Sequence, residues 1–214
     1  SVHHKALQKV GWNLPYKTVS FPPKLWGILR HTPRIGYGIL DKLFGYFDKA
    51  YNIDVWHGTF GYPIGTALAH YATKRKCPHL VRCVGEDIQL DDEIGYGFRQ
   101  NSQIDKQIRK WLPQSDRLIA ITESMADEYR AIGVADSKIS HIPNGVDLER
   151  FLVTPSRTRV RRNYSIPSDV FLFLSVGRNH PKKRYPDLLK AAATLPESVG
   201  HLALVGTGVS DLTE

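Results

Sequence analysis

Between residues 53 and 142, short apolar runs of strand length alternate with longer segments whose apolar residues recur at helical spacing. The runs that favour strands are 53–57, 79–84, 117–121 and 138–142, and the segments that favour helices are 64–76, 103–112 and 123–132. Strands separated by segments of helix length are typical of right-handed βαβ units, because a parallel strand can follow another only after a long crossover. The order therefore predicts an α/β fold built around a parallel sheet.

A strand, a basic loop and a helix follow one another between residues 170 and 190. The apolar run from Val170 stops at Gly177, the loop carries Arg178 and Lys183, and helical periodicity begins near Pro186. Ligands of open α/β sheets bind at the carboxyl ends of strands, where the first N–H groups of the next helix are unpaired. A forked guanidinium and an ammonium in that loop favour a diphosphate. The alternative is a basic loop that is only solvated.

The segment after residue 142 reads as a linker. Pro143 donates no backbone hydrogen bond and Asn144-Gly145 tolerates positive φ, so the strand at 138–142 ends there. One basic helix is expected at about 156–164, with a new sheet after Ser168, which places a domain boundary near residue 150. The arginines of this helix favour the solvated face of a linker, with a membrane-facing surface as the alternative.

Composition narrows the class of partner and compartment. A formal charge of +8 and 42% hydrophobic residues indicate a soluble α/β protein with an acidic partner. The basic clusters lack the aromatic interleaving of a nucleic-acid platform, so no nucleic acid is expected. No apolar run approaches the roughly 20 residues that span a bilayer, and residues 1–20 lack the apolar core of a signal peptide. Cys77 and Cys83 are expected to be reduced, partly buried thiols, and the acidic triplet at 91–93 to hold no metal.

An amphipathic helix is expected at 37–51, where six apolar side chains repeat at helical spacing. Core packing is the favoured use of this face. The alternative, docking on a membrane, would call for more basic residues than Lys42 and Lys49 on the polar face.

Several motifs resemble one family. The series is Ile142-Pro-Asn-Gly-Val-Asp147, then Gly177-Arg178, then Lys183, then Asp187-Leu-Leu, then Leu202-Ala-Leu-Val-Gly-Thr-Gly208. It is similar to the retaining GT-B glycosyltransferases called glycosyl transferases group 1. The resemblance implies two Rossmann-like domains, residues 1–150 on the acceptor side and residues 151–214 on the donor-nucleotide side.

The same resemblance implies roles for individual residues in the second domain. The matching Arg and Lys of the family hold the diphosphate of a nucleotide-sugar donor, so these catalytic roles fall on Arg178 and Lys183. Asn144 and Gly177 belong to the donor- and acceptor-binding set. Arg184 stands where the family usually has Gly, which predicts a different local turn.

The first domain carries matching loops. His57, with an aromatic, a Pro and a Gly after it, is a candidate contact to donor or acceptor, the alternative being a packed residue beside Trp56. Gly85, Glu86 and Asp87 resemble the family's His-Gly-x-Asp loop, where Gly permits close backbone approach and the carboxylates offer acceptors to sugar hydroxyls. The alternative is an acidic loop in water. Val84 stands where many members carry a His that lies against the transferred sugar and acceptor.

The resemblance implies transfer of a sugar from a nucleotide-diphosphate-sugar to a hydroxyl of a glycan or lipid-linked acceptor, with retention and with neither metal nor cofactor. It further implies work in cell-envelope polysaccharide biosynthesis, in the cytoplasm or peripherally at the anionic inner face of the membrane. The first βα unit and the paired-glutamate motif of the family are not found before Trp12 or Glu214, so an internal fragment is expected. The alternative function is a non-catalytic nucleotide- or phosphate-binding module on an anionic surface or nucleic acid.

Overall fold

The computed structural model describes residues 32–152, 156–196 and 198–212. They form two compact units, one made of residues up to Leu90 and from Gly97 to Pro143, the other of Asp91–Tyr96 and the chain from Asn144 onward. The predicted boundary at residue 150 lies inside the second unit. Expectations about residues 1–31 lie outside the described residues.

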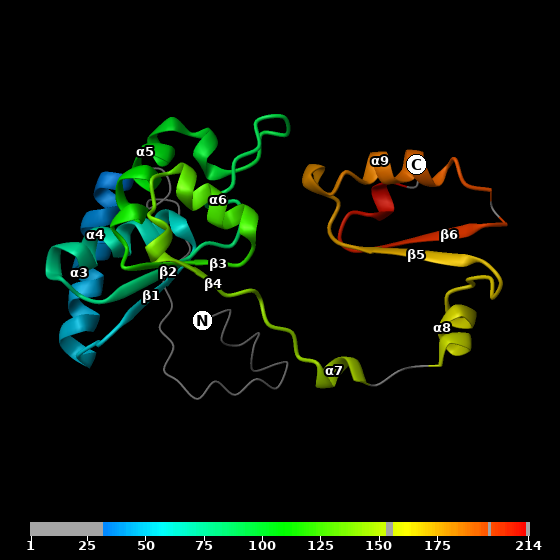
Figure 1. The fold of residues 1–214 in the computed structure, drawn as a ribbon, viewed down its shortest axis with the longest axis horizontal. Coiled ribbons are helices and arrows are strands. Elements are labelled where there is room, and N and C mark those ends of the chain that lie inside the picture. The colour runs from blue at the N-terminus through cyan, green and yellow to red at the C-terminus, as the bar shows by residue number, and fades with distance from the viewer. Residues whose placement is uncertain (1–31, 153–155, 197, 213–214) are drawn as a thin grey trace. The chain divides into compact units, whose positions relative to one another are not determined.

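The first unit contains a parallel sheet of four strands in the order β1-β2-β3-β4 (Figure 1). The strands are β1 (Trp56–Thr59), β2 (His79–Arg82), β3 (Arg117–Ala120) and β4 (Ile139–His141). The helices are α3 (Pro33–Tyr51), α4 (Thr66–Arg75), α5 (Ser102–Trp111) and α6 (Glu123–Ala131). Strands in sequential order with helical crossovers are the architecture that the periodicity predicted, and this prediction is confirmed.

Local sequence explains where these helices begin. Asn101 caps α5, since its side-chain oxygen accepts hydrogen bonds from the N–H groups of Gln103 and Ile104. Thr122 caps α6 by accepting from the N–H of Met125. A cap of this kind stabilises a helix by about 1 kcal/mol, so Asn101 and Thr122 fix where α5 and α6 begin.

Apolar faces of the helices form the core of this unit. Tyr37, Leu40 and Phe44 on α3 are buried, and the Phe44 ring lies 5.4 Å from that of Tyr71 on α4. The amphipathic segment is therefore a core helix, as predicted. On the sheet side, buried Ile108 of α5 belongs to a cluster that includes residues of β2, β3 and α6. Burying one such side chain fully stabilises a fold by roughly 1.5–3 kcal/mol.

The first strand is displaced from its prediction. The run 53–57 was expected to be the strand, whereas β1 spans Trp56–Thr59 and includes Gly58. Gly58 is buried, and a Cβ there would lie 3.0 Å from Leu68 Cδ2 on α4. Glycine in this strand marks the close approach of a helix rather than a turn. His57 consequently lies within the strand.

The second unit contains a parallel pair, β5 (Phe171–Val176) and β6 (Gly200–Val205), with α9 (Tyr185–Ala192) as their crossover (Figure 1). Two short helices, α7 (Glu149–Leu152) and α8 (Arg157–Asn163), precede β5 in the chain. The apolar run of β5 favours a buried strand, but its side chains are largely exposed in the structure: Phe171 is 73% exposed and Val176 69%. A pair of strands with one crossover helix covers little of either face.

The basic helix α8 corrects a second prediction, because Arg157 to Arg162 are not simply a solvated face. Arg161 is only 8% exposed. Its Nη1 donates to the carbonyl oxygens of Pro167 and Val170, the second over 3.1 Å. Buried backbone carbonyls need donors, and this guanidinium supplies one to the irregular segment that leads into β5.

Both cysteines are free thiols, as expected; Cys77 is partly buried as predicted, whereas Cys83 is fully buried. Within the described ranges, no helix combines the length and the apolar character that crossing a bilayer requires.

Candidate functional site: two glycine loops and a basic turn

The carboxyl ends of β5 and β6 carry two loops that run side by side. The N–H of Gly177 donates to the carbonyl of Val205 over 2.8 Å, and one step later the N–H of Asn179 donates to the carbonyl of Thr207 over 2.8 Å. A Cβ at Gly206 would lie 1.9 Å from the carbonyl oxygen of Gly177, and Gly206 has φ +154°. Only glycine allows the second loop to approach the first this closely.

A basic turn follows the first loop and folds back on it. Lys183 ends the turn Pro181–Lys183, and its N–H donates to the carbonyl of His180 over 2.8 Å. A Cβ built on Gly177 would lie 3.4 Å from Lys183 Cε, so the lysine stem passes over the end of β5. Tyr185, 2% exposed, donates its hydroxyl to the carbonyl of Gly177 over 3.0 Å and fixes the start of α9 to the same point. The structure thus brings Gly177 and Lys183 together.

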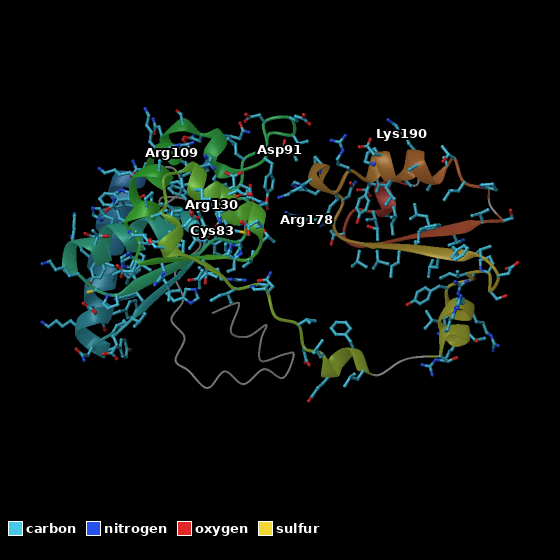
Figure 2. All side chains as sticks on the ribbon, viewed as in Figure 1. Cys83, Asp91, Arg109, Arg130, Arg178 and Lys190 are labelled. Carbon is cyan, nitrogen blue, oxygen red and sulfur yellow. The ribbon has the colours of Figure 1, made fainter. Side chains whose placement is uncertain are left out.

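Positive charge at this loop is available to a ligand. Arg178, shown in Figure 2, and Lys183 have exposed side chains, and within the described residues neither pairs with a carboxylate. The nearby Arg184 is different, since its Nε donates to Asp187 Oδ2 over 2.6 Å. That bond and the charge of the guanidinium lower the pKa of Asp187. The charges of Arg184 and Asp187 compensate each other, so Arg178 and Lys183 are the uncompensated cations of the loop.

The residue that departs from the family's usual glycine keeps a glycine-like turn. Arg184 has φ +51° and ψ +39°, and its N–H donates to the carbonyl of Pro181 over 3.0 Å. The backbone takes up the left-handed conformation, which glycine favours, in spite of the Cβ of Arg184. The ion pair with Asp187 helps to hold a conformation that disfavours arginine.

The loop after β2 is held in shape by the buried carboxylate of Asp87. Asp87 is 1% exposed, and its carboxylate accepts from the N–H groups of Gly61, Val84 and Gly85 at 2.5, 2.9 and 2.8 Å. The role predicted for Asp87, accepting from sugar hydroxyls, does not fit a carboxylate so occupied. The same bonds join the loop after β1 to the loop after β2. The exposed carboxylate in this loop is that of Glu86.

The remaining predicted residues are divided between the two units and differ in exposure. His57 on β1 is exposed, and partial burial of its imidazole with the charge of Arg82 lowers its pKa. Gly85 is buried at φ +146°, which suits close backbone packing. Asn144 is exposed and begins the second unit. His57, Gly85 and Glu86 belong to the first unit, and Gly177, Arg178 and Lys183 to the second.

Sequence reasoning gave Tyr185 no role in the site. Gly206 and Gly208 belong to the motif series that resembles the family, but no role in the site was predicted for them. A Gly-x-Gly directly after an apolar run, parallel to a second run that ends in Gly, is the signal that could have found the loop pair. The described residues contain no group of three or more His, Cys, Asp or Glu that could hold a metal ion.

The fold is that of the GT-B glycosyltransferases. Anabaena HepE in complex with UDP superimposes with a TM-score of 0.65 at 16% identity, covering 99% of this chain and 53% of that one. The galactosyltransferase WaaB of the lipopolysaccharide outer core gives 0.55 at 15% identity, covering 85% of this chain and 44% of that one.

Residues 7–150 match Glycosyltransferase Family 4, and the chain belongs to this family. A D-inositol 3-phosphate glycosyltransferase of Mycolicibacterium smegmatis is 41% identical over 99 residues, which are 45% of this chain and 22% of that protein. The corresponding enzyme 2 of Catenulispora acidiphila is 40% identical over 82 residues, 38% of this chain and 19% of that protein. The chain therefore spans about a fifth of the length of these curated relatives.

Proposed function

We propose that this glycosyltransferase moves a sugar from a nucleotide-diphosphate-sugar donor to an acceptor hydroxyl, with retention at the anomeric carbon. The observation that carries the proposal is the loop pair at the ends of β5 and β6. There Gly177 and Gly206 remove side-chain bulk while Arg178 and Lys183 supply uncompensated charge. A pyrophosphate is the donor group that this combination fits, since it offers oxygens to a fork and to a point charge together.

The chemistry assigned to the loop is stabilisation of the leaving group. A nucleoside diphosphate gains negative charge as the bond to the sugar breaks, and positively charged donors fixed before the reaction lower that barrier. Lys183 is placed by its stem over Gly177, and the start of α9 is held by Tyr185. In the first turn of α9, Pro186 has no N–H and the N–H of Asp187 donates to the carbonyl of Arg184 over 3.0 Å, so the stabilisation is assigned to the two cationic side chains. We assign this stabilisation to protein groups and propose no metal or cofactor.

The donor and acceptor are open to direct assay. Anabaena HepE is described in complexes with UDP and with UDP-glucose, which makes UDP the first nucleotide to test. For the acceptor we propose a glycan or lipid-linked hydroxyl, and the names of the curated relatives add D-inositol 3-phosphate to the panel. Glu86, His57, Gly85 and Asn144 are proposed contacts to the sugars. We further propose cytoplasmic work on cell-envelope polysaccharide, with peripheral contact to an anionic membrane.

The experiment is calorimetric titration of this chain with UDP and GDP, beside thermal melting. Lys183→Ala is expected to weaken nucleotide binding at least tenfold, as loss of one charge-assisted contact to phosphate does, with little change in Tm because the side chain is exposed. Lys190→Ala, on the last turn of helix α9, which follows the basic turn, removes the same charge and is the matched control (Figure 2). Its affinity should stay within about twofold.

Equal affinities of the wild-type and Lys183→Ala chains would contradict the assignment of the loop. Nucleotide binding that depends on Lys183 but is accompanied by no sugar transfer to any acceptor would favour the alternative, a non-catalytic nucleotide-binding module.

A further inference from the structure

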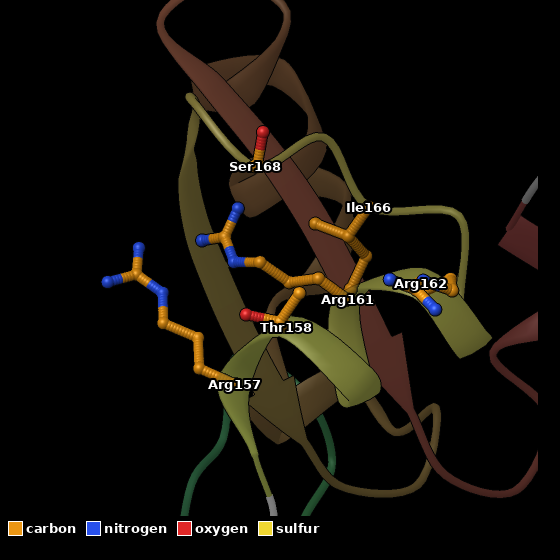
Figure 3. A pocket seen from close by; sticks show the side chains of 6 residues that line it. All are labelled: Arg157, Thr158, Arg161, Arg162, Ile166 and Ser168. Atoms are coloured by element: carbon orange, nitrogen blue, oxygen red, sulfur yellow. The ribbon is translucent and has the colours of Figure 1, made fainter.

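A second basic site lies beside helix α8, away from the glycine loops. A cavity of about 330 Å³ opens there, and Figure 3 shows its lining. The lining offers guanidinium and hydroxyl groups with a single apolar side chain: Arg157, Thr158, Arg161, Arg162, Ile166 and Ser168. Such a cavity is at the lower end of the size range of small-molecule sites, and five of its six lining side chains carry hydrogen-bond donors.

The cavity wall is built by the turn that ends α8. Ser165 is left-handed at φ +54°, and its N–H donates to the carbonyl of Arg162 over 3.3 Å. The N–H of Ile166 donates to the carbonyl of Arg161 over 2.9 Å. These two bonds are those of a Schellman turn, which brings the chain sharply back along the helix. The segment with Ile166 and Ser168 is thereby held against the side of α8.

Arg161 is fixed in this wall with donors left over. Its Nη1 serves the carbonyls of Pro167 and Val170, while Nε and Nη2 make no hydrogen bond with any described residue. Figure 3 shows the guanidinium turned toward Ser168, with that of Arg157 on the same side of the helix. A nearly buried guanidinium with unused donors that lines a cavity is prepared for an acceptor from outside.

Within the described residues, no carboxylate pairs with the charge of these arginines. Arg157, Arg159, Arg161 and Arg162 fall within six consecutive positions, and none forms an ion pair with a carboxylate of the described residues. Like charges so close repel one another, and the repulsion is relieved by a bound anion.

The cavity is not part of the proposed donor site. Val170, whose carbonyl binds Arg161, comes directly before β5, whereas Gly177 comes directly after it. The two sites therefore lie at opposite ends of a strand of six residues, which spans about 20 Å.

We propose that the α8 cavity binds the phosphate monoester group of a small phosphorylated molecule. Two guanidinium forks and the hydroxyl of Thr158 come from α8 and the hydroxyl of Ser168 from the segment after it, a set of donors that suits a tetrahedral dianion better than a planar carboxylate. A soluble phosphorylated metabolite and a lipid headgroup with a terminal phosphate both present this group.

The test is titration of the ¹⁵N-labelled chain with inorganic phosphate, followed by amide shifts. Arg178→Gln/Lys183→Gln serves as background so that the glycine loops are weakened as a competing anion site. Saturable shifts are expected for amides 157–170. In this background Arg157→Gln should weaken phosphate binding about tenfold, and Thr158→Val, which keeps the shape and removes a hydroxyl, by a few fold. Neither side chain is needed to hold the turn, so both variants should fold.

Arg159→Gln is the matched control, because it removes the same charge from the same helix without lining the cavity. Its affinity for phosphate should change less than twofold. Equal weakening by Arg157→Gln and Arg159→Gln would reduce the effect to general charge and overturn the proposal. Shifts spread over the whole surface, or the lack of saturation, would overturn it too.

Two further probes distinguish the source of the phosphate. Glycerol 3-phosphate that binds in an Arg157-dependent manner, without sedimentation on vesicles of phosphatidylcholine and phosphatidic acid, assigns a soluble ligand. Arg157-dependent sedimentation on those vesicles, but not on phosphatidylcholine alone, assigns a headgroup. UDP affinity of the chain with native Arg178 and Lys183 should be unchanged by Arg157→Gln, so this result is independent of the proposed donor site.

Discussion

Asp87 makes the most specific prediction about stability, because one buried carboxylate serves three backbone N–H groups. Oδ1 accepts from Val84 and Gly85, and Oδ2 accepts from Gly61. Asp87→Asn keeps the shape of the side chain and therefore leaves no cavity. The amide retains one oxygen, which can continue to serve Val84 and Gly85. Its –NH₂ group must then face the N–H of Gly61, donor against donor.

The magnitude follows from these contacts. An unsatisfied buried N–H costs about 1–3 kcal/mol. The two surviving bonds change from charge-assisted to neutral, which is roughly a halving of their strength and adds about 1 kcal/mol. We therefore expect Asp87→Asn to lower the free energy of unfolding by about 2–4 kcal/mol, a large part of the usual 5–15 kcal/mol. Glu86→Gln is the matched control, since this neighbour is exposed, and should change stability by less than about 0.5 kcal/mol.

Urea unfolding followed by tryptophan fluorescence measures this difference. The four tryptophans all lie between residues 12 and 111, so the signal reports on the part of the chain that contains the first unit. With a slope of about 1–3 kcal/mol per molar urea, the midpoint should fall by about 1 M or more at an unchanged slope. Equal midpoints for Asp87→Asn and Glu86→Gln would refute the structural role, and Asp87 would then return to the predicted sugar contacts.

Two further predictions follow from local backbone and charge. Arg184→Gly should raise the stability of the second unit by up to about 1 kcal/mol, because glycine adopts φ +51° without strain. Hydrogen exchange of the α9 amides measures this change, and slower exchange in Arg184→Ala than in Arg184→Gly would contradict it. His57 should titrate by NMR with a midpoint below 6.5, since partial burial and the charge of Arg82 lower its pKa, and Arg82→Gln should raise that midpoint. Because the folded pKa is the lower one, its contribution to stability is full above pH 6.5 and is lost as pH falls toward the folded pKa; a midpoint at or above 6.5 would contradict the assignment.

The order of elements was predictable because periodicity of apolar residues is a local property. Strand and helix succession from residue 53 to 142 needs no contact between distant residues, and the sheet order agrees with it. The exact course of β1 was not predictable in this way. Gly58 favours a loop when considered alone, and its place in a strand depends on Leu68, which packs against it from α4. Helix α7 spans four residues and is too short to leave a periodic signal.

In the candidate site, too, features set by local sequence were predictable, whereas features set by contacts with the backbone were not. The positions of Arg178 and Lys183 after an apolar run were enough to predict a basic loop at a strand end. Asp87 was misinterpreted because its partner Gly61 lies 26 residues earlier, so the carboxylate seemed free for a ligand. Arg161 was misinterpreted for a related reason, since the carbonyls that it binds belong to irregular backbone. In both cases the partner is a backbone group, and because almost every residue has the same backbone groups, the sequence does not indicate which of them is the partner.

The contacts of Asp87 also bear on Val84, which stands where many family members carry a histidine. Val84 contributes its backbone N–H to Asp87, and its side chain is 37% exposed. The shape of the loop is thus set by the carboxylate and by Gly85 at φ +146°, not by the side chain at position 84. Exchange of histidine for valine at this position can therefore alter what the loop presents to a ligand without altering its backbone. We therefore interpret Val84 in place of histidine as a change in the contacts to the sugar and not as a loss of the loop's structure.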